Sequence, residues 1–339
     1  MKEAQVSKGP VVTIKDVEIP KPGPKQVLIK VVVSGSNPKD WKIPEWLNKE
    51  NYNTGDDIAG YVHSVGPEVY EFKPGDRVAS FHEMMSPAGS FAEYAIGWQH
   101  TTFHLPDSIS FEEAATIPLA AMTSAIGLHL RLGLPDPWTP VPEGKKVPLV
   151  VYGGASAVGG FVIKLAQRAN IHPIIAVAGR GTSFVESLID RSKGDTIVDY
   201  RQGDSAVVQG IKDALKGEKL NYAYDAVSEN GSYNNIVKVL EPDGHLTLVL
   251  PGKEYSGIPE TVHQTMTNVG ASHADDKDYA HIMFRYFSRA LAEGWFKPHP
   301  YEVVPGGLEG VETGLRNLKE GKASAVKYVF KIGEDKGKL

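Results

Sequence analysis

The stretch VPLVVYGGASAVGG, Val147–Gly160, decides how this chain of 339 residues folds. Four apolar residues, Leu149–Tyr152, run directly into glycines and small residues. An uninterrupted apolar run is typical of a strand buried on both faces of a parallel sheet. From Val158 onward apolar residues recur with a period near 3.6, which indicates a helix. The stretch therefore predicts a strand–turn–helix whose helix N-terminus, with free N–H groups and partial positive charge, suits a pyrophosphate.

The glycine pattern of this turn departs from the usual G-x-G-x-x-G. Gly154, Ser156 and Gly159 occupy the three positions, so a hydroxyl stands where the middle glycine is expected. We predict that Gly154, Ser156, Ala157 and Val158 contact a dinucleotide. Because a lone glycine motif also fits an ordinary strand–helix turn, the rest of the chain has to distinguish the two interpretations.

Composition and charge restrict the class of protein. Hydrophobic residues make up 41% of the chain and charged residues 23%, as in ordinary soluble globular proteins. The formal net charge of -5 gives no reason to expect nucleic acid or an anionic membrane as a partner. The absence of cysteine excludes disulfides, thiolate catalysis and Cys-ligated zinc. With no targeting segment and no apolar run of ~20 residues, we expect a cytoplasmic protein.

The sequence predicts different secondary structure for residues 1–105 and for residues 147–250. Short, closely spaced strands over residues 1–105 predict a small barrel or sandwich. Strands and helices alternate from residue 147 to residue 250, which predicts an open parallel sheet with helices on both faces. The tail, with a closing strand at Ala325–Lys331, does not extend the alternation and is expected to return to the first part. The strands expected in the alternating part are Leu149–Tyr152, Ile174–Ala178, Thr196–Val198, Tyr222–Val227 and His245–Leu250.

The residues after the second strand of the alternating part select the cofactor. An acid at this position binds the ribose of NAD, whereas a basic residue accommodates the 2′-phosphate of NADP. Here the strand is followed by Gly-Arg-Gly-Thr-Ser, and the first acid is Glu186. We therefore predict NADPH, with Arg180 and Ser183 at the 2′-phosphate and Tyr200 stacking or hydrogen bonding nearby. A solvent-exposed arginine is the alternative interpretation of Arg180.

A second stretch, GDDIAGYVHSVGPEV at residues 55–69, carries a family resemblance. It matches the glycines and valine of the G-H-E-x2-G-x5-G-x2-V motif of zinc-dependent medium-chain alcohol dehydrogenases. Asp56 and Asp57 stand where that family has its histidine ligand and glutamate. The segment GSNPKDWK, residues 35–42, resembles zinc-independent quinone oxidoreductases and enoyl reductases. Further superfamily segments are GDRVASF at 75–81, GSFAEYAI at 89–96 and AATIPLAAMTSAIGL at 114–128.

The resemblance to the medium-chain dehydrogenase/reductase superfamily runs from about Val11 to Lys331. A proline-rich PDPW loop and the late segment PGGLEGVETGLRNLKEGKASAVKYVF are similar to a fungal branch with trans-acting enoyl reductases of polyketide synthesis. The resemblance implies an α/β protein with a GroES-like β-barrel catalytic domain and a Rossmann doubly wound parallel-sheet cofactor domain. The implied boundaries are residues 1–122 and 295–339 for the first and 123–294 for the second.

The resemblance also implies the site residues. Asn37 and Lys42 are expected near the nicotinamide and the substrate carbonyl, Thr123 close to the nicotinamide, and Tyr52 as a proton donor. Further cofactor contacts are implied at Val227, Leu250 and Lys327.

These observations predict an NADPH-dependent, zinc-independent reductase of activated alkenes, such as enoyl thioesters. No metal is expected, because the histidines at 63, 82, 100 and 104 form no close pair at helical ligand spacing. Asp56 and Asp57 are instead expected to accept backbone N–H bonds in a loop. Quinone reduction, an NADPH-binding protein with little turnover and a zinc alcohol dehydrogenase remain as alternatives. The substrate is either free or carrier-bound, and the protein a monomer or homodimer.

Overall fold

The computed structural model describes residues 1–335, which pack into two compact units. The first comprises Met1–Met122 and the described residues from Gly270 onward, and the second comprises Thr123–Val269. The sequence places residues 270–294 in the second domain. In the structure these residues group with the first unit, because α8 (Lys277–Ala292) packs on β7 (Thr102–His104). No helix in the described part of the chain is both long and apolar enough to cross a membrane.

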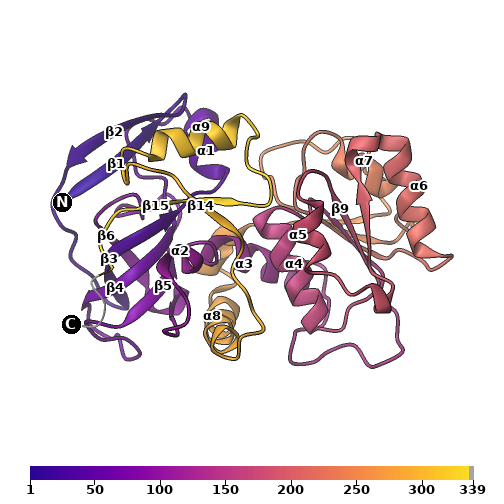
Figure 1. The fold of residues 1–339 in the computed structure, drawn as a ribbon, viewed down its shortest axis with the longest axis horizontal. Helices are drawn as coiled ribbons and strands as arrows, with labels where there is room; N and C mark the ends of the chain where they lie inside the picture. Colours follow the sequence, from indigo (N-terminus) through magenta and orange to yellow (C-terminus); the bar gives the residue numbers. More distant parts are fainter. Residues whose placement is uncertain (336–339) are drawn as a thin grey trace. The chain divides into compact units, whose positions relative to one another are not determined.

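The first unit is built on a mostly antiparallel sheet (Figure 1). Its strand order is β14-β15-β3-β4-β5-β7, and β6 also pairs with β3. Register shifts between β3 and β4 bend the sheet, as bulges do. Helices α1 and α9 pack on each other and on the β1–β2 hairpin. The strands are β1 (Lys2–Ser7), β2 (Val11–Asp16), β3 (Gln26–Gly35), β4 (Asp57–Val65), β5 (Arg77–Phe81), β6 (Tyr94–Trp98), β7, β14 (Tyr301–Val303) and β15 (Lys327–Lys331), and the helices are α1 (Lys39–Leu47), α2 (Phe111–Ala114), α8 and α9 (Val311–Lys319).

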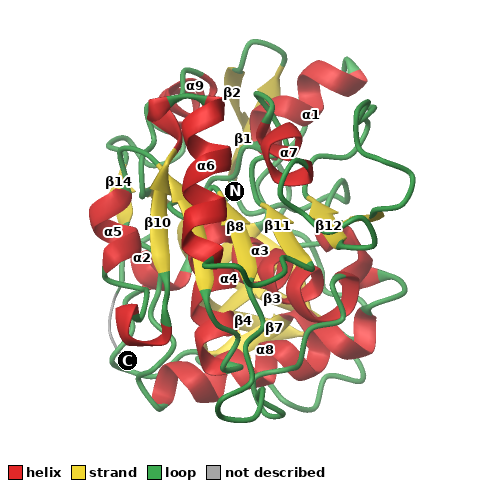
Figure 2. Cartoon of the chain, turned by 90° about the vertical axis from the view of Figure 1, so that its right-hand side faces the viewer, coloured by secondary structure: helices red, strands yellow, loops and turns green. Residues whose placement is uncertain are grey.

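The second unit is a parallel sheet with helices on both faces. Its strand order, β10-β9-β8-β11-β12-β13, is the 3-2-1-4-5-6 order of the Rossmann fold. Figure 1 shows α4 and α5 on one face and α6 and α7 on the other, and Figure 2 shows α6 and α7 in front of the strands. The strands are β8 (Leu149–Tyr152), β9 (Ile174–Ala178), β10 (Thr196–Asp199), β11 (Tyr222–Asp225), β12 (His245–Leu248) and β13 (His263–Met266), and the helices are α4 (Ala157–Arg168), α5 (Thr182–Glu186), α6 (Asp204–Leu215) and α7 (Ser232–Val237). The predicted α/β fold class is therefore confirmed.

The order of the strands fixes where ligands bind in such a sheet. The chain runs outward in one direction from β8 through β9 to β10 and in the other from β11 through β12 to β13. The reversal lies between β8 and β11, and dinucleotides bind outside the carboxyl ends of the strands at this point. The turns after β8, β9, β11 and β12 are therefore the ones that a cofactor meets.

Three elements differ from the sequence expectations. Helix α1 was not expected, because it follows Pro38, contains Pro44 and has no side-chain N-cap hydrogen bond. Pro118, a residue that commonly breaks helices, here begins α3 (Pro118–Ala125), since proline is tolerated in the first turn of a helix. The edge strand β13 is polar and exposed, so its sequence resembles a surface loop.

Candidate functional site

The turn between β8 and α4 is shaped by glycine and closed by a serine. A Cβ at Gly159 would lie 2.2 Å from the carbonyl oxygen of Gly153, so only glycine lets α4 begin this close to the strand. Ser156, at the middle motif position, is the N-cap of α4, and its Oγ accepts a hydrogen bond from the Gly159 N–H at 3.0 Å. Ser156 therefore caps the N-terminus of α4 and does not add backbone freedom to the turn, as a glycine would.

The exposed end of α4 fits a pyrophosphate. The N–H groups of Ala157 and Val158 have no acceptor among the described residues. They belong to the first turn of a twelve-residue helix, which carries a partial positive charge, and they follow a strand at the reversal point of the sheet. The predicted contacts at Gly154, Ser156, Ala157 and Val158 thus all lie on one turn of suitable chemistry.

We expect Ser156→Ala to lower the free energy of unfolding by about 1 kcal/mol, because the Gly159 N–H loses its acceptor. Chemical denaturation measures the change. Ser205→Ala, at an exposed position of α6, is the matched control and should be close to neutral. Equal effects of the two substitutions would contradict the capping role.

The turn after β9 holds the predicted 2′-phosphate residues. Arg180 is exposed here between two glycines, and Thr182 Oγ1 donates to the Gly179 carbonyl at 2.5 Å. The ring of Tyr200 lies against Gly179, where a Cβ would come within 2.5 Å of it. Arg180, Ser183 and Tyr200 therefore come from two neighbouring carboxyl-end turns, which the sequence alone could not establish.

A buried carboxylate shapes the turn after β11. Asp225 Oδ1 accepts the N–H groups of Val227 and Ser228 at 3.0 and 2.8 Å, and its Oδ2 accepts Ser232 Oγ at 2.5 Å. Burial raises the pKa of Asp225, although these donors counteract it. Ser228 has a positive φ of 56° and its Oγ accepts the Val249 N–H at 2.9 Å. Asp225 thus fixes the predicted contact residue Val227.

Leu250 lies in the next turn, after β12. Its carbonyl accepts the Tyr255 hydroxyl at 2.6 Å, and the ring of Tyr255 packs edge-on against Tyr233 at 5.0 Å between centroids. Lys253 Nζ lies 5.5 and 5.6 Å from the two ring centroids. The turn that carries Leu250 is therefore held by aromatic packing.

In the first unit the structure joins two predicted site residues that are 290 positions apart. Lys327 Nζ donates to Asn37 Oδ1 at 3.0 Å and forms an ion pair with Asp57 Oδ2 at 2.6 Å. Asn37 Nδ2 donates to the same Asp57 oxygen at 2.7 Å, and Asp57 Oδ1 accepts the Leu119 N–H at 2.7 Å. All three side chains are buried. The amide of Asn37 is therefore held in one orientation, by a cation at its oxygen and a carboxylate at its nitrogen.

A second buried ionic cluster adjoins the first along the chain. The ammonium of Lys39 contacts Asp56 Oδ2 and the Thr54 carbonyl and lies 2.9 Å from Asp40 Oδ1. His82 Nδ1 lies 2.8 Å from Asp56 Oδ1, and its Nε2 lies 3.0 Å from the Pro87 carbonyl. Ser86 Oγ also lies 3.2 Å from His82 Nε2. The cluster thus joins Lys39, Asp40, Asp56 and His82.

The charges of this cluster shift each other's protonation. Burial raises the pKa of Asp40 to about 7, even though the Lys39 ammonium counteracts the shift. Burial also opposes the ionisation of Asp56, but Lys39 and His82 outweigh it and lower the pKa of Asp56. Burial lowers the pKa of Lys39, and the carboxylates of Asp40 and Asp56 more than offset this, so that it stays raised.

The sequence expectation for Asp56 and Asp57 needs correction. Asp57 does accept a backbone N–H, from Leu119, but it also binds Lys327 and Asn37. Asp56 instead binds two side chains, Lys39 and His82, because burial leaves an ionised carboxylate in need of a cation. Within residues 1–335, no group of three or more His, Asp or Glu side chains is arranged to hold a metal ion.

Lys42 is buried rather than solvated, with 8% of its surface exposed. It lies on α1, and its ammonium is 5.5 Å from the ring centroid of Trp41 and 5.9 Å from that of Trp46. Two indole rings thus flank the cation. Each cation–π contact of this kind contributes roughly 0.5–2 kcal/mol of interaction free energy. Lys42 is therefore not a solvated surface lysine.

The remaining predicted catalytic residues lie in different settings. Tyr52 is partly buried, which raises the pKa of its hydroxyl to about 12, and the hydroxyl lies 3.8 Å from Met85 Sδ. Thr123 is buried on α3, in the second unit, and its carbonyl accepts the Tyr224 hydroxyl at 2.8 Å. The structure therefore brings Asn37 and Lys327 into direct contact but leaves the roles of Tyr52 and Thr123 as predictions.

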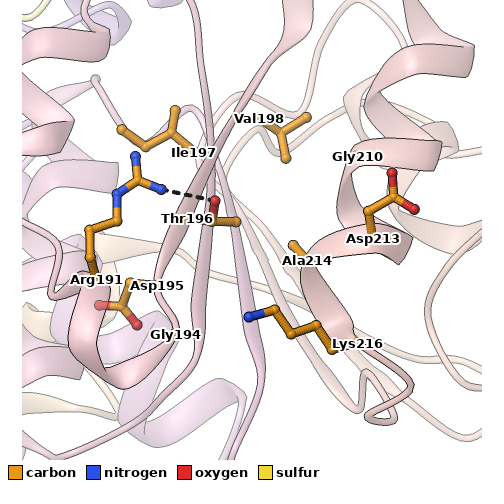
Figure 3. A pocket seen from close by; sticks show the side chains of 10 residues that line it. All are labelled: Arg191, Gly194, Asp195, Thr196, Ile197, Val198, Gly210, Asp213, Ala214 and Lys216. Atoms are coloured by element: carbon orange, nitrogen blue, oxygen red, sulfur yellow. Dashed lines mark hydrogen bonds between the residues drawn. The ribbon is translucent and has the colours of Figure 1, made fainter.

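A cavity of about 450 Å³ lies elsewhere in the second unit (Figure 3). It is found at the amino end of β10, and Arg191 on one wall donates to Thr196 Oγ1 at 3.0 Å. Asp213 and Lys216, from the end of α6, lie on the other side. Dinucleotides bind at the opposite, carboxyl ends of the strands, so this cavity is not part of the candidate cofactor site.

Sequence reasoning missed Lys39, His82 and Asp225. A signal was present for both ionic clusters, because two adjacent acids, Asp56 and Asp57, stand at the start of an otherwise apolar strand and buried acids need cations. Lys327 stands in the apolar run AVKYVF, which is the matching signal on the cationic side.

Comparisons with known proteins agree with this fold. The alcohol dehydrogenase GroES-like domain matches residues 23–107. A trans-enoyl reductase of Gibberella fujikuroi is 51% identical over 312 residues, which cover 91% of this chain and 92% of the relative. An alcohol dehydrogenase superfamily protein of Novosphingobium aromaticivorans has a TM-score of 0.80 at 20% identity, with 98% and 100% coverage. A mycobacterial protein complexed with NADPH has a TM-score of 0.75 at 20% identity, with 97% and 99% coverage.

The chain belongs to the medium-chain dehydrogenase/reductase superfamily, in its enoyl reductase family. It is accordingly an oxidoreductase with a GroES-like part and a Rossmann part.

Proposed function

We propose that this protein is an NADPH-dependent reductase of carbon–carbon double bonds conjugated to a carbonyl, with enoyl thioesters as the substrate class. The observation that carries the proposal is the buried lysine of α1, Lys42, on the same short segment as Asn37, whose amide is held by Asp57 and Lys327. The 51% identity to a trans-enoyl reductase supports the reaction class.

The choice of NADPH rests on the turn after β9. Arg180 is exposed between Gly179 and Gly181, and no acid precedes Glu186. An exposed guanidinium beside hydroxyl groups suits a phosphate monoester, which a guanidinium binds with two hydrogen bonds. The mycobacterial protein of the same fold binds NADPH, which is in keeping with this choice.

In the proposed reaction NADPH, when bound, supplies the hydride. As the hydride adds to the β-carbon of the substrate, negative charge develops on the carbonyl oxygen. The Lys42 ammonium, with indoles on two sides and little water, stabilises this charge, and Asn37 orients the carbonyl through its amide N–H. The α-carbon then takes a proton, for which the Tyr52 hydroxyl is the proposed donor. Tyr52 carries this proton at neutral pH, since burial raises its pKa from about 10 to about 12.

We expect Arg180→Glu to weaken NADPH binding by roughly 10–100-fold and NADH binding by much less, since a charge-assisted hydrogen bond is replaced by repulsion. Titration of cofactor fluorescence measures both affinities. Lys212→Glu makes the same charge change at an exposed position of α6 and should leave both affinities unchanged. An equal loss for NADPH and NADH would remove Arg180 from the phosphate site.

The direct test follows NADPH oxidation at 340 nm with the purified protein, using an α,β-unsaturated thioester, an enone and a simple quinone. Oxidation with the thioester or enone, together with a saturated product, supports the proposal. Oxidation with the quinone alone would replace it by quinone reduction. NADPH binding without oxidation of any acceptor would leave a binding protein with little turnover.

A further inference from the structure

We infer that Lys39 is a positioning residue: its ammonium, with 17% of the side chain exposed, clamps the first turn of α1 and thereby sets the positions of Asn37 and Lys42. The inference deepens the proposed function, on which it rests for the roles of those two residues.

Helix α1 is not expected to be stable without contacts to the rest of the protein. It has nine residues, too few for an isolated helix in water. Pro38 at the N-cap provides no side-chain hydrogen bond to the free N–H groups, and Pro44 removes a donor within the helix. The position of α1 therefore depends on contacts with other segments.

Lys39 supplies such contacts from the first residue of the helix. Its ammonium joins three oxygens, from Asp40 in the same turn, from Thr54 in the segment after the helix, and from Asp56 just before β4. The two carboxylates are 0% and 2% exposed, so these ion pairs are shielded from water. One cation thus holds the start of α1 against the beginning of β4.

The two carboxylates that bind Lys39 also contact other residues. Asp40 Oδ2 accepts the backbone N–H of Asn37 at 2.7 Å, which fixes the backbone before the helix. Asp56 is bound by His82, which in turn contacts the Pro87 carbonyl in the loop after β5. Lys42 is three residues after Lys39, about one helical turn away, so a displacement of the first turn displaces Lys42 as well.

The adjacent carboxylates of Asp56 and Asp57 hold different parts of the segment Asn37–Lys42. Asp57 holds the side chain of Asn37 through its amide, whereas Asp56 holds the helix through Lys39. Asp56 lies just before β4 and Asp57 is its first residue, and the two carboxylates contact different parts of the segment Asn37–Lys42. Without Lys39, Asn37 retains Asp57 as a partner, but the first turn of the helix that carries Lys42 loses its ion pairs.

The test compares Lys39→Met with the double variant Lys39→Met/Asp56→Asn. The single substitution removes the cation that contacts both carboxylates, whereas the double variant also removes the charge of Asp56. The double variant should therefore regain most of the thermal stability that the single variant loses, while the clamp is absent from both. Lys2→Met, which removes an exposed ion pair with Asp16 in the same unit, is the matched control.

Two readouts decide the outcome. Amide hydrogen exchange over Lys39–Leu47 should be at least tenfold faster in both variants than in the wild type and unchanged in Lys2→Met. The kcat/KM for an enone or enoyl thioester should fall roughly 10–100-fold in both variants, with NADPH affinity unchanged, because misplaced groups react slowly. Wild-type exchange and wild-type kcat/KM in the double variant would overturn the inference and leave Lys39 a structural cation only.

The exchange readout keeps this inference separate from the proposed function. If the wild-type protein reduces no alkene, the proposed function fails, and exchange over α1 still shows whether Lys39 holds the helix. If the wild type is active but exchange and kcat/KM do not change in the variants, the positioning role fails and the proposed function stands.

Discussion

Lys327→Met should lower the free energy of unfolding by about 3–5 kcal/mol, because it leaves a buried carboxylate without its cation. Lys327 and Asp57 are 4% and 0% exposed, and their 2.6 Å ion pair is shielded from water. Removing the ammonium also takes away the donor to Asn37 Oδ1. Chemical denaturation followed by circular dichroism measures this decrease in the free energy of unfolding. A decrease of about 3–5 kcal/mol is a large part of the total stability of most domains.

A double variant separates the charge from the packing. Asp57→Asn/Lys327→Met removes both charges but keeps an acceptor for the Leu119 N–H, so it should be much more stable than Lys327→Met alone. The exposed pair of Lys2 and Asp16 provides the matched surface case, where Lys2→Met should cost less than about 1 kcal/mol. A loss below about 1 kcal/mol for Lys327→Met would mean that the pair is not buried as described.

Lys42→Ala should lower kcat by roughly 10²–10³-fold on an enone or enoyl thioester, the usual effect of removing one group that stabilises a developing oxyanion. The affinity for NADPH should not change, because the predicted phosphate contacts are on the turns after β8 and β9 in the second unit. Steady-state kinetics and cofactor titration together measure the two quantities.

The control for this prediction is Lys30→Ala, at an exposed position of β3, which should leave kcat unchanged. Circular dichroism of both variants shows whether the fold is retained. A Lys42→Ala protein that is folded, binds NADPH and turns over at the wild-type rate would contradict the catalytic role of this lysine.

The Rossmann part could be predicted from the sequence because its strands are buried on both faces. Leu149–Tyr152 and Ile174–Ala178 are apolar throughout, and the structure has strands with these bounds. The N-cap of α4 explains why a serine is acceptable at the middle motif position, since its side chain has a partner in the Gly159 N–H. Local patterns were sufficient here because each element is determined by neighbouring residues.

The first unit was harder to predict because its site is built from long-range ion pairs. Nothing near Lys327 in the sequence indicates Asp57 or Asn37, which are 270 and 290 positions away. Helix α1 was missed because its two prolines and missing cap are typical of a loop. Its structure depends on Lys39 and Asp56, and a pattern of apolar residues cannot report such a dependence.

The position of Lys327 in the chain has a consequence for the order in which the protein matures. Strand β15 is synthesised long after β3, with which it pairs. The strands and helices of the second unit are complete by residue 269, some 58 residues before Lys327 is synthesised. A nascent chain therefore contains the whole Rossmann part before Asn37 can acquire the cation that holds its amide oxygen.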